Sequence, residues 1–364
     1  PPGRWCRPCA PLTFPAPPAP AVAHCTLSCA VVLAFVLLMP GMPGMRMLPG
    51  PAIPRGWSYN PSSWPQRAPI IALALVGFFL SRQMAAYQLG YTQTVWEPFF
   101  IPGTPAVLTS SVSRSFPISD AGLGAVAYMI EALMGFMGDK QRWRTMPWMV
   151  TFFGILVVPL GIVSVGLIIL QPVAVGEWCT PCLVAALAML IMIALTLDEV
   201  VATLQFLVQA RREGQPLWRT FWLGGTLNAD TQPRVPSRPD VVSAQAMVWG
   251  MALPWNLLAS AALGLWLMAS PAVFGTSGPA AHSAHIVGAL VVTVAIIALS
   301  DVGRAARFIN VVFGVWFITA SGLLGGGTTA ATWNGVLVGL LVIGLSRSRG
   351  PVGERYGTWA RFIR

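Results

Sequence analysis

Charged residues are scarce in this sequence: Asp, Glu, Lys and Arg make up 9% of its 364 residues, whereas hydrophobic residues make up 55%. A soluble domain carries roughly 25% charged residues, so the scarcity of charge excludes an ordinary soluble protein. Several apolar runs approach the roughly 20 residues that a helix needs to cross the bilayer core. We predict an all-α, polytopic membrane protein with about eight transmembrane helices, at 70–90, 120–138, 147–170, 180–200, 247–270, 284–300, 308–325 and 331–346.

Basic residues are nearly absent from every second loop. The chain has 22 Lys and Arg and a net charge of +10, yet Arg114 is the only one of them in the predicted loops 91–119, 171–179, 271–283 and 326–330. This alternation is the positive-inside pattern, and it predicts a multi-pass protein of the cell inner (plasma) membrane with both termini cytoplasmic. The basic patches lack a nucleic-acid reading module. We therefore expect the excess basic residues to interact with the lipid bilayer, and we expect no nucleic-acid partner.

Helical or strand periodicity is absent from residues 1–54. The stretch is Pro-rich and contains an apolar run that is short for a span. We expect a disordered or doubtful leader, with the true start near Met42, Met45 and Met47. We expect no relay role for its cysteines, which are Cys6, Cys9, Cys25 and Cys29.

A charged and Pro-rich stretch divides the remaining sequence into two halves. We predict a four-helix domain at 55–210, a cytoplasmic linker at 211–243, a two-repeat membrane domain at 244–350 and a basic cytoplasmic tail at 351–364.

The second half repeats internally, because "GLWLMASPAVFG" at 264–275 returns as "GVWFITASGLLG" at 314–325. A repeated two-helix unit indicates a structural repeat unless a further motif points to another role. Its spans contain almost no ionisable group that could couple transport. We interpret this half as a scaffold or interaction module.

Cys179 and Cys182 stand two residues apart in "EWCTPCL", at the outer mouth of the fourth predicted span. A helix N-terminus favours thiolate over thiol, and the predicted topology places the pair in the oxidising compartment where disulfides persist. The pair is open to three interpretations: a redox centre, a structural or incidental pair, or a metal site. Zinc needs four ligands, and the same side of the membrane adds only His282 and His285, so we predict no metal.

A longer pattern accompanies the cysteines. "TSSVSRSFPISDAGLGAVAY" at 109–128 runs from a Ser-rich loop through a Pro turn into a helix, with Gly124 four residues before Tyr128. With "EWCTPCL", it makes residues 60–210 resemble the vitamin K epoxide reductase family of membrane quinone oxidoreductases. The second half, with "WLMASP" at 266–271, resembles the membrane repeat named after its Ser-Pro-Trp (SPW) signature. The resemblances imply a vitamin K epoxide reductase-like four-helix bundle fused to a second four-helix repeat bundle.

The family resemblance implies a thiol–disulfide oxidoreductase whose C-x-x-C pair reduces a membrane quinone, of the ubiquinone or menaquinone type. Cys182 would face the quinone ring. Cys179 would exchange with a partner thiol, such as that of a thioredoxin-like protein on the outer face.

The sequence departs from the family pattern at two places. Family members usually carry two relay cysteines between the first two spans, whereas loop 91–119 has none and shows Thr109, Ser110 and Ser111 in the expected region. Ala186 stands where animal members carry a Tyr that bonds a quinone oxygen. The alternative function is therefore a non-enzymatic membrane scaffold that has lost the redox relay.

Few other ionisable residues lie in the spans. Arg82 and Glu131 fall within the first and second, and an intramembrane charge is costly unless it is paired. We expect a structural ion pair between them, and we expect Asp198 and Glu199, at the cytoplasmic end of the fourth span, to be solvated.

Overall fold

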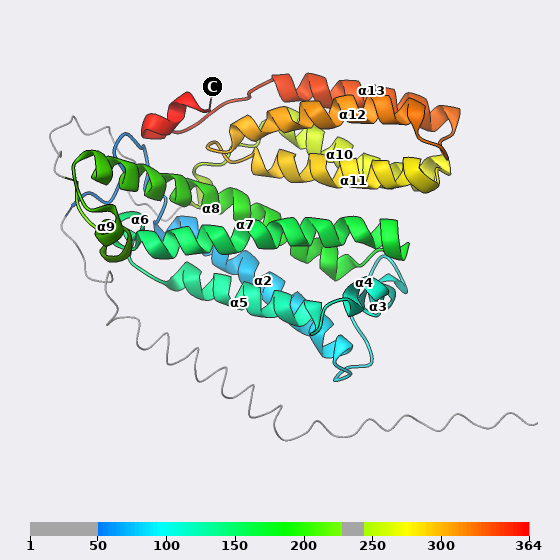
Figure 1. Ribbon diagram of the computed structural model, residues 1–364, viewed down its shortest axis with the longest axis horizontal. Helices are drawn as coiled ribbons and strands as arrows, with labels where there is room; N and C mark the ends of the chain where they lie inside the picture. Colours follow the sequence, from blue (N-terminus) through cyan, green and yellow to red (C-terminus); the bar gives the residue numbers. More distant parts are fainter. Residues whose placement is uncertain (1–49, 228–243, 364) are drawn as a thin grey trace, which may run out of the picture. The chain divides into compact units, whose positions relative to one another are not determined.

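The computed structural model describes residues 50–227 and 244–363 (Figure 1). The predicted leader, except for residues 50–54, and the second half of the predicted linker lie outside these residues. No strand occurs in the two described ranges, which contain only isolated bridges such as Trp57–Tyr356. The prediction of an all-α protein is confirmed.

Eight long helices correspond one to one to the predicted spans. They are α2 (Trp64–Gln88), α5 (Asp120–Phe136), α7 (Pro147–Leu170), α8 (Thr180–Arg212), α10 (Trp255–Phe274), α11 (Gly278–Ile297), α12 (Ile309–Leu323) and α13 (Thr329–Arg347). The short elements are α3 (Gly103–Leu108), α4 (Ser111–Arg114), the π-helical turn η2 (Gln171–Val175), α6 (Arg142–Thr145), α9 (Leu217–Leu223), and the 3-10 turns η3 (Ala244–Val248), η4 (Arg304–Phe308) and η5 (Gly357–Arg361).

Seven helices of the described residues are long and apolar enough to cross a membrane. The eighth, α5, has 17 residues and rises about 26 Å, a little less than the roughly 30 Å of hydrocarbon in a bilayer. The chain is therefore a multi-pass membrane protein, as predicted.

Local signals set where these helices begin. The Ser119 side chain accepts the Gly122 N–H (2.9 Å) at the start of α5, as a capping serine does. Pro65, Pro147 and Pro181 occupy the first turns of α2, α7 and α8, where the missing N–H removes no helical hydrogen bond.

The first four long helices share one apolar core, with Phe153 and Val157 of α7 and Met189 of α8 among its buried residues. Glycine allows α2 and α5 to approach closely. A Cβ at Gly77 would lie 2.4 Å from the Tyr128 ring, so this contact requires glycine. Helix α8 packs against α2 and α7, and it also contacts α11 of the second half.

The internal repeat is visible in the packing of the second half. Gly264 of α10 touches Gly288 of α11, because a Cβ on Gly264 would lie 2.8 Å from the Gly288 carbonyl oxygen. About fifty residues later in the chain, Gly314 of α12 and Gly339 of α13 meet in the same way, with a Cβ on either at 2.8 Å from the other's carbonyl oxygen. Small residues let helix backbones approach closely inside a membrane, and here they define each two-helix unit.

Two indole hydrogen bonds join the repeat units. Trp266 donates from Nε1 to the Asn334 side-chain oxygen (2.9 Å), and Trp316, fifty residues after Trp266, donates to Ser283 Oγ (3.3 Å). Each bond runs from the first helix of one unit to the second helix of the other. The repeat predicted from sequence is thus present as a pseudo-symmetric four-helix arrangement.

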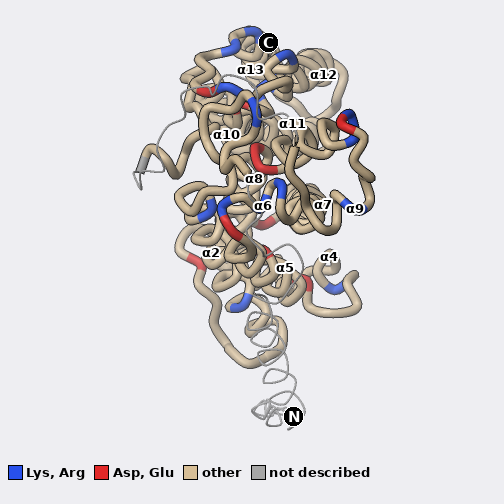
Figure 2. Tube along the Cα trace, turned by 90° about the vertical axis from the view of Figure 1, so that its left-hand side faces the viewer, with Lys and Arg blue, Asp and Glu red and all other residues tan. Residues whose placement is uncertain are grey.

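A buried polar layer lies at the end of the bundle opposite the cysteines. Asp198 and Glu199 are each 2% exposed, so the expectation that they are solvated is wrong. Tyr59 donates to Asp198 Oδ2 (2.5 Å), and Arg142 binds both oxygens of Glu199 (2.6 Å each). Figure 2 shows basic and acidic positions adjoining around α6 and α8. These residues are buried because segment 57–62 and α6 fold over the middle of α8.

The same layer closes the end of α5. Arg67 donates from Nη1 to the carbonyls of Met137 (2.9 Å) and Gly138 (3.1 Å), while Arg142 donates to those of Met134 (2.8 Å) and Met137 (3.0 Å). The last carbonyls of a helix lack internal partners and carry negative partial charge. The guanidinium groups of Arg67 and Arg142 supply both hydrogen-bond donors and positive charge at this helix end.

The described part of the predicted tail packs into this layer. Tyr356 is fully buried and donates to Asp301 Oδ2 (3.0 Å). Gln205 of α8 accepts from the Trp57 indole (3.0 Å) and donates to the Tyr356 carbonyl (2.9 Å). Residues from both halves and from the end of the chain are joined here through α8.

The predicted Arg82–Glu131 pair is wrong. Arg82 is exposed on α2, whose bundle face carries Ser81, Met84 and Ala85. Glu131 is fully buried in α5, and its carboxyl oxygens have no hydrogen-bond partner among the described residues. The rotation of α2 about its own axis, which sequence spacing does not reveal, turns the two side chains apart.

Glu199→Ala tests the polar layer. The substitution leaves the buried guanidinium of Arg142 without its counter-ion, and we expect a loss of about 3–5 kcal/mol in the free energy of unfolding. The measurement is the midpoint of thermal unfolding of the purified protein in detergent. Glu177→Ala, which removes an exposed carboxylate, is the matched control. Equal midpoints for the two variants would contradict this role for Glu199.

Candidate active site at the start of helix α8

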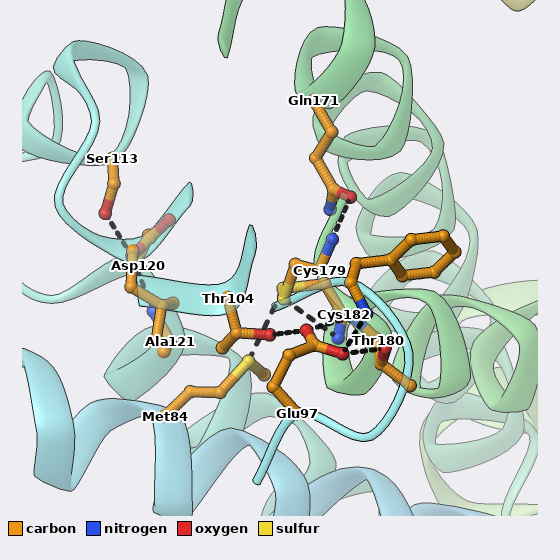
Figure 3. The surroundings of a disulfide bond; sticks show 12 residues. Met84, Glu97, Thr104, Ser113, Asp120, Ala121, Gln171, Cys179, Thr180 and Cys182 are labelled. Atoms are coloured by element: carbon orange, nitrogen blue, oxygen red, sulfur yellow. Dashed lines mark hydrogen bonds between the residues drawn. A yellow bond between two sulfur atoms is a disulfide. The ribbon is translucent and has the colours of Figure 1, made fainter. Parts of the chain in front are cut away.

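The structure joins Cys179 and Cys182 in a disulfide at the first turn of α8 (Figure 3). Cys179 is the N-cap residue, and its sulfur accepts the Cys182 N–H (3.3 Å). The Cys179 N–H donates to the side-chain oxygen of Gln171, in the π-helical turn that ends α7 (3.0 Å). Both predicted site residues are therefore brought together at a helix N-terminus, where positive potential stabilises a thiolate.

The two sulfurs have different surroundings. Cys179 is 0% exposed and packs in a small cluster with Met84, Leu108 and Ala121. Cys182 is half-buried, and its sulfur lies 3.4 Å from the Met84 sulfur. One sulfur is covered by protein, whereas Cys182 is on the wall of a cavity.

This cavity has a volume of about 130 Å³ and lies between α2, α3, α4, α5, α7, the turn η2 and α8. Its walls are mainly apolar and include Ile168, Ala185 and Ala186. Tyr128 also lines it and donates from its hydroxyl to the Ala185 carbonyl (2.7 Å). Gly124 lines the cavity as well, and a Cβ there would lie 3.3 Å from the Ser81 hydroxyl. Gly124 and Tyr128, singled out in the sequence pattern, thus both face the cavity beside Cys182.

A polar cluster holds the loop between α2 and α5 in place. Gln88, at the end of α2, donates to Asp120 (2.6 Å) and Ser113 (2.7 Å) and accepts from Ser119 (2.5 Å). Ser110, in the region where the family carries a cysteine, lines the cavity and caps α4. The polar residues of this region therefore serve packing and capping in the structure.

We call residues 91–108 the lid, because this segment and its helix α3 lie over the start of α8. Val95, Val107 and Leu108 of the lid join the cluster that covers Cys179. Gly103 touches the chain next to Cys179: a Cβ on it would lie 1.9 Å from the Trp178 carbonyl oxygen. Only glycine fits at that position.

Glu97 fastens the lid to the C-x-x-C segment (Figure 3). Its carboxylate accepts the N–H of Thr180 (3.0 Å) and the hydroxyls of Thr180 and Thr104. It also accepts the N–H groups of Phe99 (3.2 Å) and Phe100 (3.1 Å). Thr180 lies between the two cysteines, so a single carboxylate connects the lid to the disulfide loop.

The hydrogen bonds determine the charge of this group. Burial by itself raises the pKa of Glu97, but the hydrogen bonds from Thr104, Thr180 and Phe100 outweigh it and lower the pKa from its ordinary 4.5 to about 2. Glu97 is therefore an anion at the N-terminus of α8. Glu97 was not predicted as a site residue, although it is the only acidic residue in loop 91–119.

The second half of the chain also reaches this site. The Trp178 ring lies edge-on to His285 of α11, with ring centroids 5.7 Å apart, and at 6.4 Å from the Phe100 ring of the lid. Trp178 therefore contacts both the lid and the repeat half directly beside Cys179.

Two segments of the chain match known protein families. Residues 68–197 match the Vitamin K epoxide reductase family. Residues 254–348 match the SPW repeat domain, so both resemblances seen in the sequence are confirmed. The vitamin K epoxide reductase family segment contains Cys179, Cys182, the cavity and the lid, and it indicates oxidoreductase activity in the membrane. Comparison with curated proteins and with solved structures finds no match.

The hydrogen bonds between Glu97 and Thr180 depend on the charge of the Glu97 carboxylate and therefore on pH. The folded pKa is lowered, so the contact is complete above about pH 4.5 and is lost as the pH falls towards 2. We expect protection of the Thr180 amide from hydrogen exchange, corrected for intrinsic rates, to decline over this range. The Leu183 amide, which bonds to the Cys179 carbonyl (3.0 Å), is the internal control. Constant protection of Thr180 down to pH 2 would contradict the assignment.

Proposed function

We propose that this protein is a membrane thiol–disulfide oxidoreductase in which the Cys179–Cys182 pair passes two electrons to a membrane quinone of the ubiquinone or menaquinone type. The observation that carries the proposal is the position of Cys182 on the wall of a cavity inside a vitamin K epoxide reductase family segment. Members of that family use quinones.

The chemistry follows from the two environments. Reduced, the pair holds two electrons and two protons more than the disulfide. Cys182, on the cavity, would give its electrons to the quinone ring, which becomes a quinol as the disulfide re-forms. Cys179 would accept the next pair of electrons by exchange with an external thiol. The N-terminus of α8 lowers the cost of the thiolates in both steps.

The cavity suits one ring better than a whole quinone. Its volume of about 130 Å³ is below the roughly 300–1,000 Å³ of sites that enclose a drug-sized ligand, so an isoprenoid tail would lie outside, along the bundle. Ile168, Ala185 and Ala186 would contact the ring. Ser81 and Gln171 provide a hydroxyl and an amide on the wall that could donate to the quinone oxygens.

The distribution of basic residues supports an orientation. The site is built from loops 91–119 and 171–179, which contain only Arg114 among Lys and Arg, so the positive-inside rule directs the site outwards and both termini to the cytoplasm. A thioredoxin-like protein on the outer face of the inner (plasma) membrane is then the expected thiol partner.

The first test is thiol trapping of the two cysteines in membranes. We expect a short-chain quinone to oxidise the reduced pair and a dithiol to reduce it again, and we expect Cys179→Ser or Cys182→Ser to lower turnover to the uncatalysed background. A variant with Ser at all four leader cysteines should keep its activity. If quinone never changes the thiol state, the alternative of a membrane scaffold without redox function replaces this proposal.

Ala186→Phe tests the cavity. A benzyl group there would fill the space beside Cys182, so we expect at least about a tenfold loss of quinone-dependent oxidation, with unchanged reduction of the disulfide by a small dithiol. Leu187→Phe is the matched control, because Leu187 is the next residue and is 47% exposed on the outside of the helix. Equal activity of the two variants would place the quinone elsewhere.

A further inference from the structure

In the proposed function, electrons have to reach the Cys179–Cys182 disulfide from a donor outside the chain. Loop 91–119 contains no cysteine, so no thiol of this loop can pass electrons to the pair. With no relay role expected for the leader cysteines, an external dithiol is the electron donor in the proposed function, yet the sulfur expected to receive it, on Cys179, is wholly buried. Something has to move before the exchange can take place.

The lid is held at the start of α8 by apolar contacts near its two ends, where Val95, Val107 and Leu108 pack in the cluster with Cys179, and by polar contacts of Glu97 between them. The large apolar side chains around Glu97 add little protein contact, because Trp96 is 47%, Phe99 77% and Ile101 78% exposed. Apolar burial stabilises in proportion to the area removed from water, so these side chains hold the lid weakly. The Glu97 carboxylate, by contrast, accepts two hydrogen bonds from Thr180 across the boundary between lid and helix.

We propose that Glu97 is a latch: a positioning residue that holds the lid over Cys179 and has to release Thr180 before an external dithiol can reach the Cys179 sulfur. The inference rests on the proposed function for its redox role, and on the structure alone for its effect on access to Cys179. Release also withdraws a negative charge from the helix N-terminus, which favours the thiolates formed during exchange.

The exchange behind an open latch is balanced. A thiolate of the dithiol attacks the Cys179 sulfur, the bond to Cys182 breaks, and Cys182 leaves as a thiolate. The second thiol of the partner, as its thiolate, attacks the mixed disulfide and releases Cys179 as a thiolate. The partner departs as a disulfide, and the C-x-x-C pair has gained two electrons that a quinone can later remove.

The test measures access to each cysteine separately. In a chain with Ser at the leader cysteines, Cys182→Ser leaves Cys179 as a single thiol and Cys179→Ser leaves Cys182. Alkylation of each by a maleimide is followed in membranes, with Glu97→Ala, Glu97→Gln or the control Glu177→Ala added. Because several hydrogen bonds are lost, we expect Glu97→Ala to accelerate alkylation of Cys179 by about tenfold, with Cys182 unchanged. Glu97→Gln keeps an acceptor oxygen and should lie between Ala and Glu.

A second readout uses the partner reaction. With both cysteines present, Glu97→Ala should accelerate reduction of the disulfide by a thioredoxin-class dithiol protein, and Glu177→Ala should not. Unchanged alkylation of Cys179 in Glu97→Ala would overturn the latch. So would equal acceleration at both cysteines with a lowered unfolding midpoint, because Glu97 would then support the fold in general. Faster alkylation of Cys179 in a protein that never reacts with quinone would uphold the latch and reject the proposed function.

Discussion

Helix α8 has buried polar groups at two depths, and the surrounding chain is arranged to satisfy both. Thr180 and the disulfide lie at its start, and Asp198 and Glu199 lie 18 residues later. At 1.5 Å per residue the two layers are about 27 Å apart, close to the thickness of a bilayer's hydrocarbon core. Unpaired polar groups inside that core are costly. Glu97 of the lid therefore supplies the hydrogen-bond partner of Thr180 in one layer. In the other layer, Tyr59 and Arg142 supply the partners of Asp198 and Glu199.

This arrangement gives the site two different sides. The carboxylate at the mouth of α8 ties down the segment between the cysteines and leaves Cys179 covered, while Cys182 stays on the cavity. In the proposed function this separation gives the external thiol and the quinone different sulfurs, so that they do not compete for one. The covering segment is held by apolar packing near its ends and by hydrogen bonds of Glu97, which can be exchanged for bonds to water at modest net cost.

The repeat half takes part in both layers. His285 of α11 lies against Trp178 beside the disulfide, and Asp301, in the connection between α11 and α12, accepts from Tyr356 beneath the other layer. Its paired glycines let the two helices of each pair pack closely. The repeat half thus contributes one side chain next to the disulfide and one to the buried polar layer.

The sequence by itself determined the features that depend on local order. Apolar run lengths located all eight long helices, although α8 continues 12 residues past its predicted end and α10 begins 8 residues after its predicted start. The C-x-x-C motif at the mouth of the fourth predicted span put the cysteines at a helix start, and the fifty-residue repeat predicted the paired helices. The tertiary structure alone decided which polar groups meet. Glu97 is hydrogen-bonded to Thr180, 83 residues later in the chain, and Tyr59 is hydrogen-bonded to Asp198, 139 residues later. The Arg82 side chain, by contrast, points away from Glu131. Such pairings depend on how whole helices rotate and pack against one another. Packing between distant segments sets this arrangement, and no periodic pattern in the sequence shows it.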